Sequence, residues 1–402
     1  MKNKKGGTAV ARSRIGIMGG SFNPIHRRHL QIAQSALEEM NLSRVLFIPN
    51  GNPPHKHNEL AGAAHRYEMT RLAVIPYEQL AVSDLEMTRE GIVYAVDTLK
   101  LLHKKYPSAD FFYIIGEDTL FDLVHWVQPL EVFKLCTFLV CLRENRSLEG
   151  NPGVQALKDK GADIRFLSLA PFDVSASDIR RQIAQGVMND ALLTPEVCEY
   201  IRIMGLYGSS FALDNAQNVY NTLKGDLSDD RLLHSLAVAY TAMKLAQTHN
   251  LDVPACELAG LLHDCAKCMG LKSMQRIARD AKLQLTETEF NAPGLLHGPV
   301  GAVVAKSKYG IVRQDILTAI ETHTTGFAGM SPFDMVIFLA DKIEPYRDDI
   351  PELAEIRALA TQNLYKATYL MLLSSKEHVA QTKRPLHPAT EQTLQWVREH
   401  MQ

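Results

Sequence analysis

Residues 19–29, with the sequence GGSFNPIHRRH, constrain the fold of this chain more than any other segment. They follow a short apolar run, residues 15–18, that is typical of a buried strand, and they precede apolar residues at helical spacing from Leu30 onward. The segment is therefore predicted to be a glycine-rich turn from a strand into a helix that begins near His29. Such a turn presents free backbone N–H groups and a helix dipole, which suit a bound phosphate.

Two histidines lie at fixed offsets within this turn. His26 and His29 are three residues apart, and at the start of a helix this spacing puts both imidazoles on one side. Imidazoles that face a phosphate site can donate hydrogen bonds to oxygens that gain charge in a transition state. A lone Gly-Gly after a strand usually marks only a tight turn, but the added Asn-Pro corner and histidines favour a functional site.

Size and charge narrow the class of protein. A chain of 402 residues predicts two domains. With 43 Lys+Arg against 45 Asp+Glu, the net charge of −2 gives no electrostatic reason to expect a nucleic-acid or membrane partner. We find neither a signal peptide nor an apolar run long enough to cross a bilayer, and six cysteines do not indicate a disulfide scaffold. We expect a cytoplasmic enzyme. The sequence does not decide whether the chain forms a homo-oligomer.

Strand-like and helix-like segments alternate up to about residue 205. The pattern predicts helices over residues 65–75 and 93–106. It predicts strands over residues 15–18, 45–48, 80–82, 111–115, 137–142 and 164–167. This alternation favours an α/β fold with a doubly wound parallel sheet, whose ligands bind beyond the carboxyl ends of the strands.

Polar and aromatic residues follow several of these strands. Lys56 lies in a proline-rich loop after the second strand, where it could contact a phosphate or simply be a solvated lysine. Asp118 follows the strand at 111–115, Trp126 comes eight residues later, and Arg143 follows the next strand. A tryptophan by itself is more often part of a core than a ligand platform.

A second candidate anion site lies near the end of this half. We expect Ser177 to be the N-cap of a helix, with Arg180 one turn into it. A hydroxyl, free N–H groups and an arginine together can bind an anion, although alone they describe an ordinary capped helix.

Taken together, these two motifs resemble those of bacterial nicotinate-mononucleotide adenylyltransferases, over roughly residues 12–208. The resemblance implies a nucleotidyltransferase Rossmann-like fold that transfers AMP from ATP, bound with Mg²⁺, to nicotinate mononucleotide in NAD biosynthesis. It implies that ATP binds Gly20, Ser21, Phe22, His26, His29, Ser177 and Arg180, of which His26, His29 and Arg180 are catalytic. It also implies that Trp126 stacks on the nicotinate ring while Lys56, Asp118 and Arg143 bind the mononucleotide. The family often has Ser-Tyr-Thr or Ser near the third strand, where this chain has Val93-Tyr94-Ala95, so the preference between nicotinate and nicotinamide stays open.

The second half has a different pattern. Glycine and serine at residues 205–210 interrupt the chain, and from about residue 214 the pattern is helical almost throughout. We therefore predict two domains, residues 1–208 and 209–402.

Histidines and aspartates in the second half lie within or directly after apolar helical runs, where polar groups need partners. They are His234, His263, Asp264, His297, His323 and Asp341. A cage of imidazoles and carboxylates around a metal would satisfy them, although any one alone could be an ordinary core residue.

The adjacent His263-Asp264 pair, with flanking histidines and a distal aspartate, resembles the metal signature of HD domains. The wider strings around His297, His323 and Asp341 resemble the YqeK-type branch of HD-domain phosphohydrolases, over roughly residues 212–400. The resemblance implies an all-α HD domain that hydrolyses diadenosine tetraphosphate symmetrically to ADP at two divalent metal ions, with iron expected and manganese or cobalt also suitable. One metal would bind His234, His263, Asp264 and Asp341, and Asp264 would bridge to a second, bound by His297 and His323. Lys267 would contact a substrate phosphate during catalysis.

We therefore expect a bifunctional enzyme, with the hypothesis that its HD domain removes adenylylated polyphosphates that arise as side products of the first domain. One alternative has the first half transferring AMP to phosphopantetheine or CMP to a small phosphate, although Trp126 and Lys56 favour a pyridine mononucleotide. Another has the second half acting as a nucleotide sensor without hydrolysis. The Cys265–Cys268 pair is a weak redox signal, because it follows a metal motif on a helix.

Overall fold

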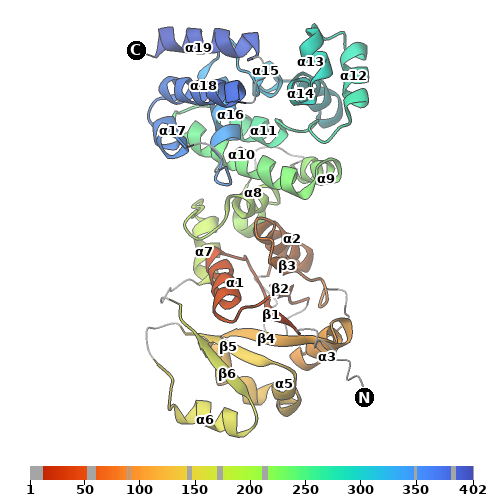
Figure 1. Cartoon of the computed structure of the whole chain (residues 1–402), viewed down its shortest axis with the longest axis vertical. Helices are drawn as coiled ribbons and strands as arrows, with labels where there is room; N and C mark the ends of the chain where they lie inside the picture. Colours follow the sequence, from red (N-terminus) through yellow and green to blue (C-terminus); the bar gives the residue numbers. More distant parts are fainter. Residues whose placement is uncertain are drawn as a thin grey trace, which may run out of the picture. The chain divides into compact units, whose positions relative to one another are not determined.

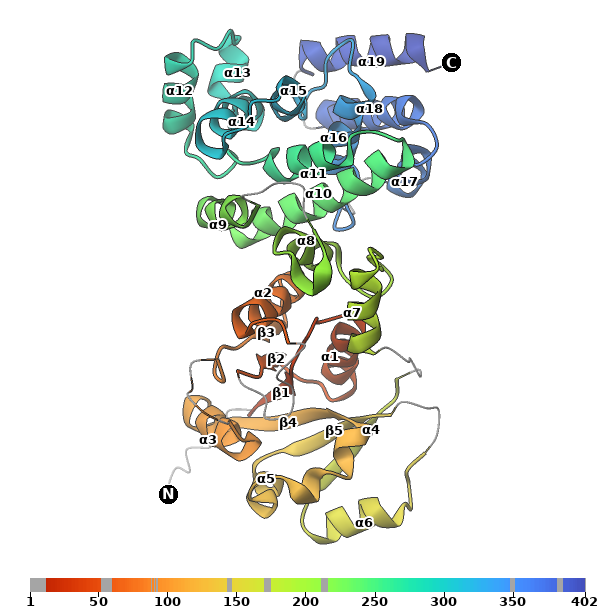
Figure 2. The same cartoon turned by 180° about the vertical axis from the view of Figure 1, so that it is seen from behind.

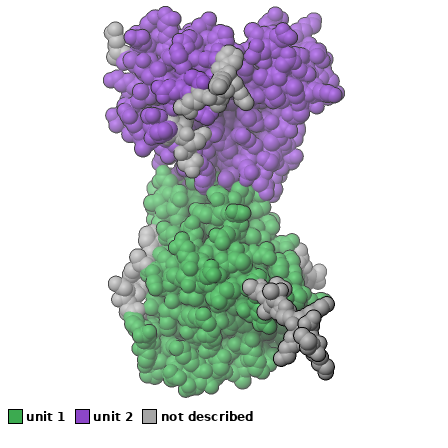
Figure 3. Space-filling view, in the orientation of Figure 1, with its two compact units in different colours: residues 1–197 green, residues 198–402 purple. Residues whose placement is uncertain are grey.

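The computed structural model describes residues 12–51, 60–87, 89, 91, 93–142, 147–169, 175–210, 216–347, 351–381 and 386–401. The chain forms two compact units, residues 1–197 and 198–402, which Figure 3 colours separately. All strands among the described residues belong to the first unit, and the regular structure described in the second is helical. No helix among the described residues is long and apolar enough to cross a membrane.

A parallel sheet organises the first unit, as predicted. Its strands are β1 (Ser13–Gly20), β2 (Arg44–Pro49), β3 (Leu80–Val82), β4 (Ala109–Gly116), β5 (Thr137–Cys141) and β6 (Asp163–Leu167). They lie in the order β3-β2-β1-β4-β5-β6, and every pairing is parallel. The chain reverses its winding direction between β1 and β4, so a crevice opens beyond the carboxyl ends of these two strands.

Helices lie between the strands and after the last of them, as Figures 1 and 2 show from opposite sides. They are α1 (Arg27–Glu39), α2 (Ala63–Val74), α3 (Ala95–Lys105), α4 (Glu117–Leu120), α5 (Pro129–Leu135), α6 (Pro152–Asp159), α7 (Ala176–Ala184) and α8 (Pro195–Ile203), with the 3-10 helices η1 (Leu123–His125) and η2 (Leu206–Gly208). The predicted helices over residues 65–75 and 93–106 correspond to α2 and α3. Helix α1 begins at Arg27, two residues before the predicted start.

Both faces of the sheet are buried, which explains the near-continuous apolar runs of its strands. On one face, alternate residues such as Ile17 and Tyr113 pack into a core with Leu99 of α3. Residues of the opposite parity, such as Val45 and Phe47, have no exposed surface either. The carboxyl ends of the central strands are therefore rigidly placed.

The second unit is built from packed helices. They are α9 (Ala216–Asp226), α10 (Asp229–Thr248), α11 (Val253–Leu262), α12 (Leu271–Asp280), α13 (Glu287–Asn291), α14 (Pro293–Tyr309), α15 (Gln314–Thr322), α16 (Pro332–Ile343), α17 (Leu353–Ala360), α18 (Leu364–Gln381) and α19 (Pro388–His400). Helix α10 packs against α11 and α16, and α15 packs against α11, α14 and α16 (Figure 1). The predicted α-helical second half is confirmed, because the regular structure described in this unit consists of helices.

The compact units do not divide at the predicted position. The first unit ends at Val197, within α8, whereas the sequence placed the boundary after residue 208. The segment predicted as a linker contains η2, in which Tyr207 has a φ of 57°. The assignment of functional domains to residues 1–208 and 209–402 stays a prediction.

Candidate functional site

A cavity of about 450 Å³ lies at the carboxyl ends of the central strands of the first unit. Its lining includes Gly19 and Gly20 from the end of β1, Gly116 from the end of β4, and Asn50 directly after β2. This is the crevice that the strand order creates, so the predicted glycine-rich turn and the ends of neighbouring strands line one cavity.

The glycine-rich turn is held by close contacts on both sides. A Cβ atom on Gly19 would lie 2.7 Å from the hydroxyl oxygen of Tyr113, so only glycine fits there without a shift. Phe22 has a φ of 44°, a left-handed conformation that bulky residues rarely adopt. Asn23 is buried, and its side-chain oxygen accepts a hydrogen bond from the backbone N–H of Ala61 at 3.0 Å. These contacts fix the backbone path of the turn.

Both histidines of the turn line the cavity. The imidazole rings of His26 and His29 stack with their centroids 3.8 Å apart. The backbone N–H of His26 donates to Nδ1 of His29 at 3.2 Å, so the ring hydrogen of neutral His29 lies on Nε2. Nδ1 of His26 is buried and has no hydrogen-bond partner among the residues that the structure describes. The two rings are therefore adjacent polar groups with hydrogen-bonding capacity left for a ligand.

Both rings are neutral near pH 7. Burial, with the positive charge of Arg28 nearby, lowers the pKa of His26 to about 4. Burial and the adjacent His26 ring hold the pKa of His29 well below its ordinary value. The pair can therefore donate hydrogen bonds to a ligand without carrying positive charge. Arg28 also lines the cavity and brings a permanent cation, which the sequence reasoning did not identify although it lies between the two histidines.

The second predicted anion site differs in one detail. Helix α7 has Ser175 as its N-cap, so the prediction that Ser177 caps this helix is wrong. Ser175 has extended backbone angles and Ala176 is already helical, which places Ser177 within the first turn. The hydroxyls of the two serines lie 2.5 Å apart. Arg180 donates to the backbone oxygen of Asn23 at 3.0 Å, so this helix contacts the glycine-rich turn.

The residues predicted to bind the mononucleotide have mixed placements. Trp126 lines the cavity and packs edge-on against Tyr113, with ring centroids 5.7 Å apart. Asp118 is exposed on α4 and is not among the lining residues, whereas its neighbour Thr119 is. Lys56 and Arg143 lie outside the described residues.

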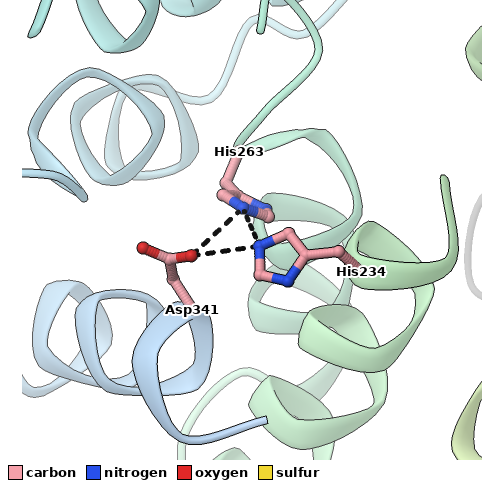
Figure 4. A group of neighbouring side chains, drawn as sticks. All are labelled: His234, His263 and Asp341. Carbon is pink, nitrogen blue, oxygen red and sulfur yellow. Dashed lines mark hydrogen bonds and ion pairs between the residues drawn. The ribbon is translucent and has the colours of Figure 1, made fainter. Parts of the chain in front are cut away.

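In the second unit, the six predicted ligands come together. His234 is on α10, His297 on α14 and Asp341 on α16, while His263-Asp264 and His323 directly follow α11 and α15. Figure 4 shows the side chains of His234, His263 and Asp341 pointing toward one another. Nε2 of His234 lies 3.3 Å from Nε2 of His263 and 3.1 Å from Oδ1 of Asp341.

Asp264 lies between two groups of imidazoles. Its Oδ2 is 3.6 Å from Nε2 of His263 and 4.0 Å from Nε2 of His234. Its Oδ1 is 3.1 Å from Nε2 of His297 and 3.7 Å from Nε2 of His323. Each carboxylate oxygen therefore faces a different pair of imidazoles.

The tautomers of these histidines show that the cluster fits a cation. The Nδ1 atoms of His263, His297 and His323 lie 2.7–3.2 Å from backbone carbonyl oxygens, and Nδ1 of His234 lies 3.3 Å from Oε1 of Glu344. These oxygens can only accept, so each neutral ring carries its hydrogen on Nδ1 and a lone pair on Nε2. The Nε2 atoms of His297 and His323 nevertheless lie 3.0 Å apart. Lone pairs that converge beside carboxylates form an arrangement that fits a divalent cation.

Both carboxylates of the cluster are ionised. Although burial opposes ionisation, the imidazoles and cations around Asp264 and Asp341 hold the pKa of both well below the usual range. Imidazoles together with ionised carboxylates, and without a thiolate in the cluster, form a donor set that divalent transition metals accept.

Among the residues that the structure describes, four cations lie beside the carboxylates of the cluster. Arg231 lies 3.2 Å from Oδ2 of Asp264, and Lys267, which was predicted to contact phosphate, lies 3.5 Å from Oδ1 of Asp264. Lys342 and Arg347 lie 3.2 and 3.4 Å from the carboxylate of Asp341. Arg231 was not identified from the sequence, although this residue precedes His234 by one helical turn. Arg347 was not identified either, because it lies beyond the motif around Asp341.

A cavity of about 530 Å³ opens beside this cluster, lined by Asp341, Lys342, Arg347 and residues of α18. It gives a phosphorylated ligand room beside the candidate metal site. Cys265 is buried and donates to the backbone oxygen of Gly301, whereas Cys268 is exposed, so they share no disulfide.

Known proteins are similar to both units. Residues 17–182 match the cytidylyltransferase-like family model, and residues 231–346 match the HD domain, which implies divalent metal binding. A Mycoplasma genitalium protein named probable nicotinate-nucleotide adenylyltransferase/Ap4A hydrolase is 29% identical over 90% of this chain and 97% of its own length. A Gloeobacter violaceus probable nicotinate-nucleotide adenylyltransferase is 37% identical over 48% of this chain and 96% of its own length. A solved Clostridium acetobutylicum structure, described as a predicted HD superfamily hydrolase involved in NAD metabolism, is 33% identical over 46% of this chain and 97% of its own, with a TM-score of 0.45.

Proposed function

We propose, because this chain belongs to the nicotinate-nucleotide adenylyltransferase family and continues into an HD domain, that it catalyses two reactions. The first unit transfers AMP from ATP, bound with Mg²⁺, to nicotinate mononucleotide and releases pyrophosphate. The second hydrolyses diadenosine tetraphosphate to two molecules of ADP. The similarity to a relative with both activities in its name extends over 90% of the chain, which supports the pairing of the two reactions.

Adenylyl transfer needs positioning and charge stabilisation more than a protein nucleophile. The mononucleotide phosphate attacks the α-phosphorus of ATP in line, and pyrophosphate leaves. The observation that supports this reaction best is the cavity at the ends of β1 and β4, lined by both glycines and both neutral imidazoles. We assign His26 and His29 to the triphosphate, with the N–H on Nε2 of His29 as a donor.

Other residues of the first unit complete this assignment. We assign Gly20, Ser21 and Phe22 to the turn beneath the triphosphate. Ser177 and Arg180 are assigned to the far oxygens of the triphosphate. The contact of Arg180 with the Asn23 carbonyl supports this assignment, because it links α7 to the turn. We assign Trp126 to the nicotinate ring, since it lines the same cavity. Roles for Lys56, Asp118 and Arg143 in mononucleotide binding rest on family resemblance alone.

For hydrolysis, the six-residue cluster is the supporting observation. We assign one metal to His234, His263, Asp264 and Asp341, and a second to Asp264, His297 and His323, with iron expected. Bound metals supply Lewis acidity toward the phosphates and activate water. The four surrounding cations, Lys267 among them, bind the phosphate chain and offset its charge. The back-side hydrogen bonds on Nδ1 hold each imidazole in the tautomer that binds a metal.

Product analysis of the purified full-length chain tests both reactions. With ATP, Mg²⁺ and each pyridine mononucleotide in turn, we expect deamido-NAD and pyrophosphate from nicotinate mononucleotide. With diadenosine tetraphosphate and ferrous, manganese or cobalt ions, we expect ADP as the only nucleotide product. Transfer to phosphopantetheine or use of CTP would overturn the first assignment. Binding of the tetraphosphate without hydrolysis in every metal would make the second unit a nucleotide sensor.

A further inference from the structure

Arg66 is one of the largest fully buried side chains in the protein, with 1% of its surface exposed. It lies in the first turn of α2 and was not identified from the sequence, where it is an isolated arginine in a helix. A buried guanidinium is costly unless its N–H groups are satisfied. Its partners therefore show what it stabilises.

The guanidinium of Arg66 donates to four backbone carbonyl oxygens. Nε donates to Ala61 at 3.0 Å, Nη1 to Ser21 at 2.9 Å, and Nη2 to Asn50 at 2.6 Å and Gly51 at 3.0 Å. These oxygens belong to segments far apart in the chain. Ser21 follows β1, and Asn50 and Gly51 follow β2. One side chain thus joins the loops at the ends of two adjacent parallel strands.

Both loops contribute to the cavity at the strand ends, since His26 of the first loop and Asn50 of the second line it. The backbone N–H of Asn50 also donates to the oxygen of Gly20 at 3.0 Å, so the two loops are in direct contact. Because a peptide unit is planar, a bond that fixes the Ser21 carbonyl also fixes the direction of the Phe22 N–H. Phe22 has the left-handed φ of 44°, which such a bond helps to maintain.

We propose that Arg66 is a positioning residue for adenylyl transfer, which fixes the glycine-rich turn relative to the loop after β2. This proposal rests on the proposed function of the first unit. The planar fork of the guanidinium reaches carbonyls of both loops at once, which a lysine ammonium cannot do with the same geometry. Small displacements of reacting groups lower reaction rates steeply. Replacement of Arg66 should therefore lower kcat and not only the stability of the fold.

Arg66→Lys in the full-length chain tests the proposal. We expect kcat for adenylyl transfer to fall roughly 10- to 100-fold and the dissociation constant for ATP to rise severalfold. Hydrolysis of diadenosine tetraphosphate by the same preparation should stay within about twofold of wild type, because the second unit is unaltered. Arg66→Gln, which leaves no buried charge, carries the same expectation should the lysine variant not fold.

Arg202→Lys is the matched control, because Arg202 makes two hydrogen bonds to the buried carboxylate of Glu257 in the second unit. It should lower stability without lowering kcat for adenylyl transfer. Unchanged kcat and ATP affinity in the folded Arg66 variant would overturn the positioning role. If wild type itself makes no dinucleotide, the proposed function fails, and the ratio of ATP dissociation constants alone then decides the role of Arg66.

Discussion

Hydrogen bonds on the far side of each imidazole decide how the histidines of both units can act. His29 accepts from a backbone N–H through Nδ1, which leaves a donor on Nε2 for an anion. His263 instead donates from Nδ1 to the backbone oxygen of Gly260 at 2.7 Å, which leaves a lone pair on Nε2 for a cation. The hydrogen bond on Nδ1 thus makes an imidazole suited to donate to an anion in one unit and to bind a cation in the other.

The Nδ1 atom of His234 has a different partner from those of the other imidazoles of the cluster. The carboxylate of Glu344 accepts a hydrogen bond from His234, whereas backbone carbonyls accept from the other three. A carboxylate behind a ligand histidine raises its basicity. We expect Glu344→Ala to weaken metal affinity roughly 10- to 100-fold, measured by competition with a chelator. Glu344→Gln keeps an acceptor and should lie between wild type and the alanine variant. Equal affinities for all three would contradict this role.

His26 makes stability depend on pH. Its pKa is about 4 in the folded chain and about 6.5 when unfolded, so the unfolded chain binds more protons between these values. Stability of the first unit therefore falls as pH drops below 6.5, by about 2 kcal/mol between pH 7 and pH 5. We expect His26→Asn to remove this part of the pH dependence. Denaturant unfolding reported by Trp126 in a Trp396→Phe background measures it, and equal pH slopes would contradict the assignment.

At the scale of elements, strands were predictable because β1 through β6 are short apolar runs bounded by turns. Cap identity was not, because Ser175 and Ser177 are chemically equivalent and only backbone angles distinguish them. The clustering of the six candidate ligands in the second unit was predictable, because each lies within or directly after an apolar helical run. Arg66 could not be found in this way, because its hydrogen bonds join segments that no local pattern connects.

Side chains that lie on, or directly after, α10, α11, α14, α15 and α16 surround Asp264, so we expect this residue to control the whole cluster. Asp264→Ala removes the carboxylate that faces both imidazole pairs, and we expect it to lose both metals. Metal analysis by mass spectrometry of the purified chain measures this. Asp334→Ala is the control, because Asp334 is a buried carboxylate that accepts hydrogen bonds from Ser331 at the start of α16 and is not one of the six candidate ligands. Retention of both metals by the Asp264 variant would refute the bridging role.

At the scale of the whole molecule, the proposed function assigns two sites, with separate residues, to separate compact units. In this proposal the first site would use neutral imidazoles and glycine N–H groups for a triphosphate, and the second would use imidazole lone pairs and carboxylates for metals. The hypothesis that the second site removes adenylylated side products of the first adds a functional link to this pairing. This link is tested by comparing the products of the intact chain with those of variants that lack one site. Adenylylated side products should accumulate only when the second site is inactive, and identical product profiles would remove the case for a functional link.

The most direct measurement is therefore to assay both activities in two full-length variants, each of which alters one site. We expect His29→Ala to lower adenylyl transfer roughly 10²- to 10³-fold, as loss of one transition-state donor does, while hydrolysis of diadenosine tetraphosphate continues. Asp264→Ala should abolish hydrolysis and leave transfer at the wild-type rate. Loss of both activities in either folded variant, or retention of both, would contradict two separate sites.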